Sequence, residues 1–169
     1  EDLRRMLMEL AALTDKLTVE WTPPSDGPER PCVRVLRADG TDTGIAFHGV
    51  PGGHEFNSFV VGLYNAAGPG QSIDPALAEA IAAIDRPLDL QIVVALSCTM
   101  CPELVIAAAS NPLVTAKVYD VNHFPELRER YKIMSVPCLI INKAKVAFGK
   151  KTLGQLLELL AEPEAGQTG

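Results

Sequence analysis

The chain has 169 residues, of which 47% are hydrophobic and 5% aromatic, and its formal net charge is −6. This length suits one domain, or two small domains packed together, with a core built mainly from aliphatic side chains. The acidic balance, without a basic stripe, argues against a nucleic acid as the partner. The longest apolar runs are too short to cross a membrane.

The number and spacing of the cysteines indicate the redox state of the compartment in which the chain works. Of the four cysteines only one pair is closely spaced, which suits a reducing, cytoplasmic compartment better than a disulfide-stapled secreted domain. No secretory leader is visible. Because the sequence opens at Glu1 and not at a methionine, we expect a fragment or a processed chain.

The first 84 residues are predicted to alternate short helices and strands. Apolar residues at helical spacing indicate the helices, and short alternating or β-branched runs indicate the strands. We predict helices over residues 2–16, 55–64 and 75–84, and strands over residues 17–21, 32–36 and 44–47. The apolar face of the first helix comprises Leu3, Met6, Leu7, Leu10 and Leu13, and that of the second comprises Phe56, Phe59, Val60 and Leu63. Asp74 is predicted to cap the third helix, with Pro75 at its first position.

The second half opens with an apolar, β-branched run, predicted to be a buried strand over residues 88–96. A Cys-x-x-Cys pair, Cys98 and Cys101, follows directly, and Pro102 then begins a helix-forming run to about residue 109. Beyond it we predict strands over residues 115–120, 138–142 and 145–148, helices over residues 125–131 and 152–160, and a linker-type tail over residues 162–169.

The two thiols therefore lie where a buried strand turns into a helix. A helix N-terminus presents unpaired N–H groups and the positive end of the helix dipole, and a cysteine pKa of about 8.5 can fall there to roughly 3.5–7.5. Two intervening residues let one helical turn bring the sulfurs within bonding reach. We interpret the pair as a redox dithiol, with Cys98, nearer the exposed end of the helix, as the attacking thiol and Cys101 as the resolving thiol.

Two other interpretations of the pair have less support. Half of a zinc site would need a second pair of ligands, whereas the histidines are only His48, His54 and His123 and no second Cys-x-x-Cys exists. Two unreactive buried cysteines would leave the strand–Cys-x-x-Cys–helix context unexplained. We therefore predict no metal site in this chain.

The order of elements over residues 88–160 is β-α-β-α-β-β-α, which resembles the thioredoxin fold with its dithiol after the first strand. Ser135-Val136-Pro137 precedes the third strand of this unit, where thioredoxin-like proteins place a cis-proline that faces the dithiol. The resemblance implies that Pro137 belongs to the site. Its cis bond would turn the backbone beside the sulfurs and leave backbone N–H and C=O groups that can pair with a client chain.

The first half repeats part of this pattern. Pro31-Cys32 and Pro137-Cys138 each open a strand that is followed by a turn, a strand ending in phenylalanine, a glycine and a helix. For both cysteines we predict a small buried side chain at the start of a central strand, the alternative being an auxiliary thiol close to the dithiol.

The repeat predicts an α/β chain of two tandem thioredoxin-like folds. The first, over residues 1–84, lacks its opening strand and a Cys-x-x-Cys, and the second, over residues 85–161, carries the dithiol. The missing strand is expected to leave an unpaired edge in the first sheet. A homodimer or the strand of a partner could cover such an edge.

Four motifs, two of them already described, point to a family: Gly49-x-Pro51-x-Gly53-His54-Glu55-Phe56, Ile84-Asp85, Leu96-Ser97-Cys98-x-x-Cys101-Pro102 and Val136-Pro137. Together they resemble the N-terminal domain of the flavoprotein component of alkyl hydroperoxide reductase, in which two thioredoxin folds lie in tandem and only the second keeps the dithiol. The resemblance covers essentially the whole chain. The first motif is not a general thioredoxin feature and carries most of the specificity.

This resemblance implies a thiol–disulfide oxidoreductase for peroxide detoxification. It would pass electrons from a flavoprotein disulfide reductase domain to a peroxiredoxin or a similar disulfide-bearing client. FAD and NAD(P)H are implied only for a fused or partner reductase domain, because this chain has no G-x-G-x-x-G loop. The strand before the dithiol has no acid where thioredoxins carry one, and the resemblance implies that Glu55 acts as the acid/base across the cleft between the folds. The alternative for Glu55 is a helix-start carboxylate favoured by the dipole.

Two other functions stay open at this point. The nearer one is a stand-alone disulfide oxidoreductase or isomerase of two thioredoxin folds, although such proteins typically carry a dithiol in both. The other is a non-catalytic binding module with structural cysteines, which a reversible two-electron redox couple would exclude.

Overall fold

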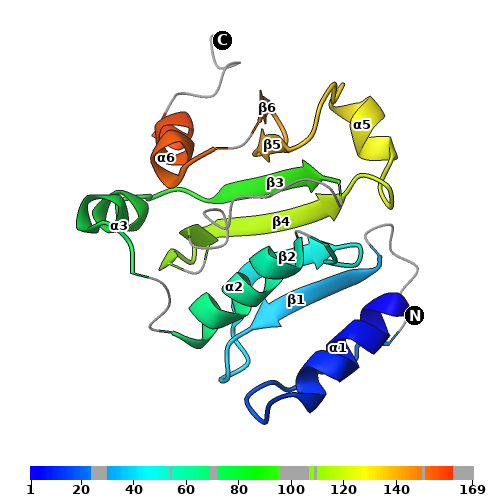
Figure 1. Ribbon diagram of the computed structural model, residues 1–169. Coiled ribbons are helices and arrows are strands. Elements are labelled where there is room, and N and C mark those ends of the chain that lie inside the picture. Colours follow the sequence, from blue (N-terminus) through cyan, green and yellow to red (C-terminus); the bar gives the residue numbers. More distant parts are fainter. Residues whose placement is uncertain are drawn as a thin grey trace.

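The computed structural model describes residues 1–23, 30–53, 55–68, 72–95, 107–108, 110–149 and 151–161, and for Glu55 the backbone alone. These residues form one six-stranded mixed sheet, in the order β1-β2-β4-β3-β5-β6, with helices packed against it (Figure 1). The helices are α1 (Asp2–Ala12), α2 (Glu55–Ala67), α3 (Pro75–Ala82), α5 (Glu126–Arg130) and α6 (Leu153–Ala161), and the strands are β1 (Cys32–Leu36), β2 (Asp42–His48), β3 (Leu88–Val94), β4 (Val114–Asp120), β5 (Cys138–Ile141) and β6 (Lys145–Phe148). Within the described ranges, each helix falls short of the length and apolar character that a membrane crossing needs.

The second half of the sheet has the predicted thioredoxin order. β3 pairs in parallel with β4 and in antiparallel orientation with β5, which forms a hairpin with β6. The apolar residues of β3 are almost all buried because this central strand is covered on both faces. The predicted helices over residues 75–84, 125–131 and 152–160 are confirmed as α3, α5 and α6, with ends shifted by one or two residues. Asp74 caps α3 as expected, since its carboxylate accepts the N–H of Ala76 at 2.8 Å.

The first half adds the hairpin β1–β2 to this sheet. β2 pairs in parallel with β4, with Ile45 opposite Ala116 and His48 opposite Tyr119, so strands from both halves share one sheet. Among the described strands, β1 is the last on this side of the sheet, and an unpaired edge left by a missing opening strand stays a prediction. That a second copy or a partner covers the edge stays a prediction.

The strand predicted over residues 17–21 is wrong, because these residues have no regular structure. Alternating hydrophobicity makes a strand only where a neighbouring strand can accept its backbone hydrogen bonds, and no described strand pairs with this segment. Its side chains are used for packing instead. Val19 contacts the core, and the Trp21 ring lies 5.0 Å from the guanidinium of Arg4 on α1.

The apolar faces of the first two helices are narrower than predicted. α1 ends four residues earlier than expected, at Ala12, and Leu13 is 82% exposed. On α2, Phe59 is buried and meets Phe47 of β2 edge to face at 5.3 Å between centroids. Phe56 and Val60 were predicted to face the core but are 38% and 39% exposed. The sheet lies along one side of α2 only, so the side chains about a quarter-turn away from Phe59 remain partly exposed to solvent.

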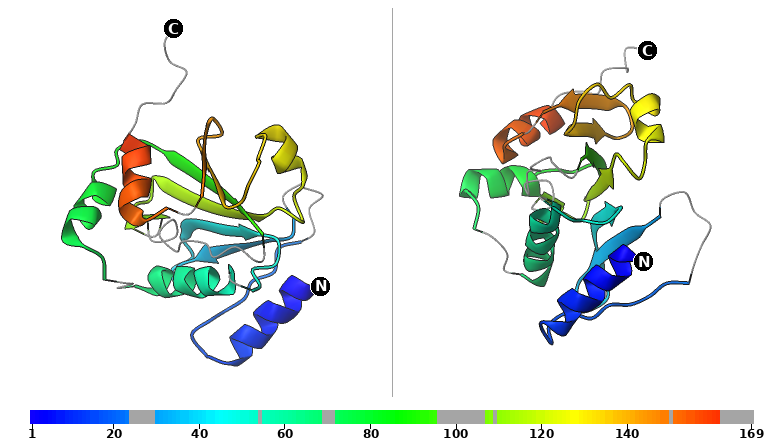
Figure 2. Two further views of the ribbon diagram at one scale, coloured as in Figure 1. Left: turned by 45° about the horizontal axis from the view of Figure 1, so that its top comes forward. Right: turned by 45° about the vertical axis from the view of Figure 1, so that its right-hand side comes forward.

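The sheet separates two apolar clusters. The larger contains Ile45, Phe47 and Ile92 of the strands and is covered by α1, α2, α3 and α6, whereas the smaller contains Tyr119 of β4 and is covered by Leu127 of α5. Figure 2 shows α2, α3 and α6 on one side of the sheet and α5 on the other (right-hand view). A single register row crosses all six strands on the α5 side: Cys32, His48, Tyr119, Val93, Cys138 and Phe148.

The two Pro-Cys hairpins of the predicted repeat have the same backbone pairing. The N–H of Gly49 donates to the Pro31 carbonyl at 2.7 Å, and the N–H of Gly149 donates to the Pro137 carbonyl at 2.9 Å. The register corrects one detail, because β2 ends at His48 and not at Phe47, so that the counterpart of Phe148 is His48. The hairpins therefore repeat, while two complete folds, with a boundary near residue 84, stay a prediction.

Candidate redox site at the carboxyl edge of the central strands

The segment with the dithiol joins two well-defined points of the fold. β3 ends at Val94, and the chain is helical again at Ala107 and Ala108, which are buried in the larger cluster. Cys98, Cys101 and the rest of residues 96–106 lie outside the described residues. The pair is thus carried between the carboxyl end of a central strand and a helical stretch packed on the sheet, which is the connection that the sequence predicts.

Pro137 lies at the same edge of the sheet. Cys138 is opposite Val93, so in this antiparallel pair Pro137 is level with Val94, the last residue of β3. The Val136–Pro137 peptide bond is cis, as the thioredoxin resemblance implies. The described geometry brings Pro137 beside the start of the dithiol segment, and its part in the reaction stays a prediction.

Glu55 begins α2, but its side chain lies outside the described part of the chain, as does all of His54. The loop that leads to α2 is described. Val50 and Pro51 line a cavity of about 10 Å³ together with Val94 and Ala95 at the end of β3, a space of the size of one water molecule. The backbone before Glu55 therefore reaches the strand that carries the dithiol.

The first glycine of the Gly49-x-Pro51 motif has a structural reason. Gly49 has a φ of +109°, and a Cβ there would stand 2.9 Å from the Cβ of Asp120. Asp120 is nearly buried at the end of β4, where its Oδ1 accepts the N–H of Asn122 at 2.9 Å. Its Oδ2 lies 3.9 Å from Nε2 of His123. The missing side chain at Gly49 lets the loop after β2 pack directly on this carboxylate.

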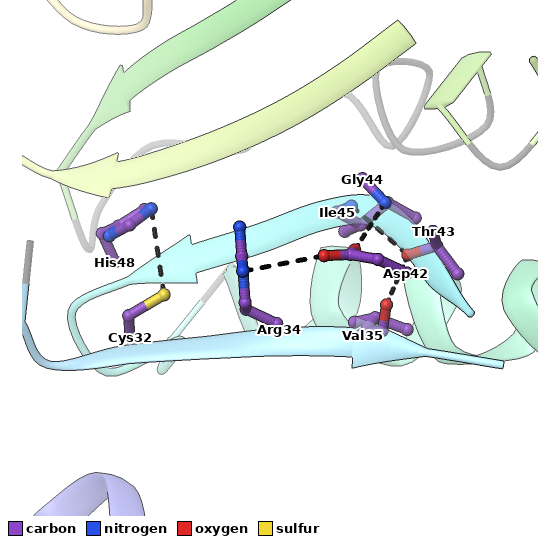
Figure 3. A network of polar contacts seen from close by, with 8 residues as sticks. All are labelled: Cys32, Arg34, Val35, Asp42, Thr43, Gly44, Ile45 and His48. Atoms are coloured by element: carbon purple, nitrogen blue, oxygen red, sulfur yellow. Dashed lines mark hydrogen bonds and ion pairs between the residues drawn. The ribbon is translucent and has the colours of Figure 1, made fainter. Parts of the chain in front are cut away.

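The two cysteines that follow the motif prolines differ in their surroundings. Cys138 is fully buried, as predicted, and burial raises the pKa of its thiol to about 11. Cys32 is only half-buried, and its Sγ lies 3.8 Å from Nε2 of His48 on the neighbouring strand (Figure 3). The prediction of a small buried side chain is confirmed for Cys138 and is wrong for Cys32, which is only partly buried.

His48 was not singled out from the sequence. It is 4% exposed, stacks on the Tyr119 ring at 4.3 Å with an interplanar angle of 5°, and meets Phe124 edge to face. Its position directly before the glycine of a motif was the available signal, but only the strand register places it opposite Cys32. Among the described residues, no three His, Cys, Asp or Glu side chains gather as a metal site requires.

Comparisons with known proteins agree with this geometry. The family described as "Thioredoxin domain" matches residues 88–161. The crystal structure of the NTD_N/C domain of alkylhydroperoxide reductase AhpF from Enterococcus faecalis superposes with a TM-score of 0.88 at 36% identity, covering 95% of this chain and 83% of that one.

Two curated relatives extend the comparison. The F subunit of alkyl hydroperoxide reductase in Pseudomonas aeruginosa is 32% identical over 98% of this chain and 31% of its own length. A protein named NADH dehydrogenase from Ferdinandcohnia aciditolerans is 31% identical over 99% of this chain and 32% of its own length. The chain thus spans about a third of the curated relatives that it matches. With its α/β thioredoxin-like fold, it belongs to the family of the N-terminal domain of the alkyl hydroperoxide reductase AhpF.

Proposed function

We propose that the chain is a dithiol electron-transfer module that uses Cys98 and Cys101 to reduce the disulfide of a peroxiredoxin or a similar client. The observation that carries the proposal is the course of the chain around the Cys-x-x-Cys: the segment that contains it leaves the carboxyl end of β3, level with Pro137, and leads to the buried residues Ala107 and Ala108, in a sheet of thioredoxin order. Membership of the family supports the same chemistry. The cysteine usage supports a cytoplasmic location.

The reaction transfers two electrons and two protons to the client. The Cys98 thiolate attacks one sulfur of the client disulfide, that S–S bond breaks, and a mixed disulfide forms while the leaving sulfur takes up a proton. Cys101 then attacks Cys98, which releases the second client thiol and leaves a Cys98–Cys101 disulfide. A dithiol of a flavoprotein reductase domain restores the reduced pair, and FAD and NAD(P)H belong to that domain.

Glu55 is the proposed proton donor to the leaving thiolates. The β3 positions nearest the dithiol are apolar, whereas the loop before Glu55 meets the end of that strand. Glu55→Gln should slow reduction of a disulfide client by about 10²-fold, the low end for a general acid, because water can substitute. Glu79→Gln, an exposed carboxylate on α3, is the matched control. Equal rates for the two variants would remove Glu55 from the mechanism.

The test of the function is a redox titration of the whole chain, followed by client assays. We expect a reversible two-electron couple that disappears in Cys98→Ser, and a trapped mixed disulfide with a peroxiredoxin in Cys101→Ser. The absence of a couple would leave a binding module as the better description. Comparable turnover of unrelated protein disulfides, with no preference for a peroxiredoxin, would favour the stand-alone oxidoreductase instead.

A further inference from the structure

We propose that basic side chains beside Pro137 dock the client through acidic residues that flank its disulfide. This proposal rests on the function proposed above and names the chemistry of the partner that the same redox edge takes. The docking surface, which we call the basic rim, consists of Arg128 on α5, Lys132 and Met134 in the loop before β5, and Lys151 after β6.

The basic residues of this acidic chain are unevenly distributed. Residues 121–151 hold seven of the 15 lysines and arginines but only two of the 21 acidic residues, a net charge of +5. The remaining residues hold eight basic and 19 acidic side chains, a net charge of −11. The basic segment contains α5 and the β5–β6 hairpin, which lie in the same part of the molecule, at the top of Figure 1. Such a distribution attracts an acidic partner to one part of the surface.

Arg128, Lys132 and Met134 are held in place by the buried residue among them. Ile133 lies in the smaller apolar cluster, and its N–H donates to the carbonyl of Arg128 at 2.9 Å. Lys132 and Met134 flank Ile133 on the surface. Lys132 is exposed, with a φ of +51°, and Met134 is 83% exposed. Three residues after Met134 the chain reaches Pro137, so both side chains stand next to the redox edge.

Lys151 reaches the same place from the other strand of the hairpin. Phe148 is opposite Cys138, and the N–H of Gly149 donates to the Pro137 carbonyl at 2.9 Å. Nζ of Lys151 folds back to donate to the Phe148 carbonyl at 2.7 Å. This bond uses one of the three donors of the ammonium group. The basic rim thus approaches Pro137 along the chain from Lys132 and across the hairpin from Lys151.

Two observations distinguish the basic rim from an ordinary solvated face. Within the described ranges, neither Arg128 nor Lys132 forms an ion pair, although Glu126 and Glu129 lie on the same helix. The exposed Met134 supplies an apolar contact next to these charges, and an apolar centre with a charged rim is typical of protein–protein interfaces, in which methionine is enriched. This combination fits a partner that brings carboxylates together with an aliphatic side chain.

The reaction itself brings such groups to the rim. The client cysteine has to reach the segment that leaves β3 level with Pro137, and the residues next to that cysteine come with it. Carboxylates among them gain mainly a faster encounter, since charge complementarity at an exposed surface changes the association rate more than the affinity. The same rim repels a client whose disulfide is flanked by lysine or arginine.

The experiment measures the reduction of synthetic peptides by the fully reduced whole chain in a single turnover. Each peptide contains one internal disulfide with a leucine beside it, and the flanking positions are glutamates in one peptide and glutamines in the other. We expect the glutamate peptide to be reduced about 5- to 20-fold faster at low ionic strength, and the difference to fall below about twofold in roughly 0.5 M salt.

Two lysines provide a matched pair of variants. Lys132→Glu should lower the preference for the glutamate peptide by about 3- to 10-fold, because it removes an attraction and adds a repulsion. Lys143→Glu makes the same change of charge at another exposed lysine of positive φ, +59°, in the turn beyond the far end of β5. This control should keep the preference within about twofold of that of the parent chain. Arg128→Glu repeats the test at a helical position if Lys132→Glu does not fold, as judged by circular dichroism.

The outcomes separate the docking proposal from the proposed function. Equal rates for the two peptides, or a preference that Lys132→Glu and Lys143→Glu lower alike, would overturn the docking proposal. The electron-transfer function would still stand in that case, because both peptides are reduced. Reduction of neither peptide by the parent chain would remove the proposed function, and the docking proposal with it.

Discussion

Asn111 offers a direct test of how the two halves of the chain are held together. This residue is 6% exposed and lies between the helical stretch that includes Ala107 and Ala108 and strand β4. Its Nδ2 donates to the carbonyls of Ile81 and Ile84 at 2.8 and 3.1 Å, at the end of α3, and its Oδ1 accepts the N–H of Leu113 at 2.9 Å. One side chain thus ties the last helix of the first half to the first turn before β4.

The effect of Asn111→Ala follows from the groups that lose this side chain. The Ile81 carbonyl keeps a backbone donor, the N–H of Ile84 at 3.2 Å, so its loss of a hydrogen bond costs the least free energy. The Ile84 carbonyl and the Leu113 N–H lose a partner in a part-buried setting, at about 1–3 kcal/mol each. We expect a loss of about 3 kcal/mol, which for a chain of this length lowers Tm by about 6–12 °C.

Urea denaturation of the whole chain, followed by circular dichroism, measures this loss. Asn122→Ala is the control, because Asn122 is exposed and donates its backbone N–H, not its side chain, to Asp120. This variant should unfold within about 0.5 kcal/mol of the parent chain. If Asn111→Ala also stays within that margin, the hydrogen bonds of Asn111 do not stabilise the junction between the halves, and the reasoning is wrong.

Three other predictions concern the carboxyl edge. Burial raises the pKa of Cys138 from 9.0 to about 11. The thiol therefore ionises first in the unfolded chain, and the free energy of unfolding should fall by up to about 3 kcal/mol as pH rises through this window. Urea denaturation at a series of pH values should show this fall in the parent chain and not in Cys138→Ala. Gly49→Ala should destabilise the chain by about 1–3 kcal/mol more than Gly40→Ala, because both glycines have a positive φ but only at Gly49 would a Cβ collide with Asp120. Equal free energies of unfolding for the two variants would contradict this. Pro137→Ala should slow client reduction strongly while it changes the urea midpoint of unfolding only slightly. A large loss of both would make the role of Pro137 structural.

Much of the fold follows from local sequence. The hairpin over residues 138–148, the capped start of α3 at Asp74 and the buried run of β3 were all predictable, because a turn, a cap or a β-branched run acts within a few residues. The motif around Gly49 and the position of Cys98 and Cys101 indicated the family in the same way. In each case the chemistry that fixes the structure lies in neighbouring residues.

Other features depend on which segments meet. Residues 17–21 have the pattern of a strand and are not one, because no described strand pairs with them. Val60 of α2 is apolar yet exposed, because the sheet covers only one side of that helix. Cys32 and Cys138 each follow a motif proline, but the register sets an imidazole opposite Cys32 and a phenyl ring opposite Cys138. Register and strand order arise from contacts between residues far apart in the chain, so only the tertiary structure decides which of two similar thiols has a base beside it.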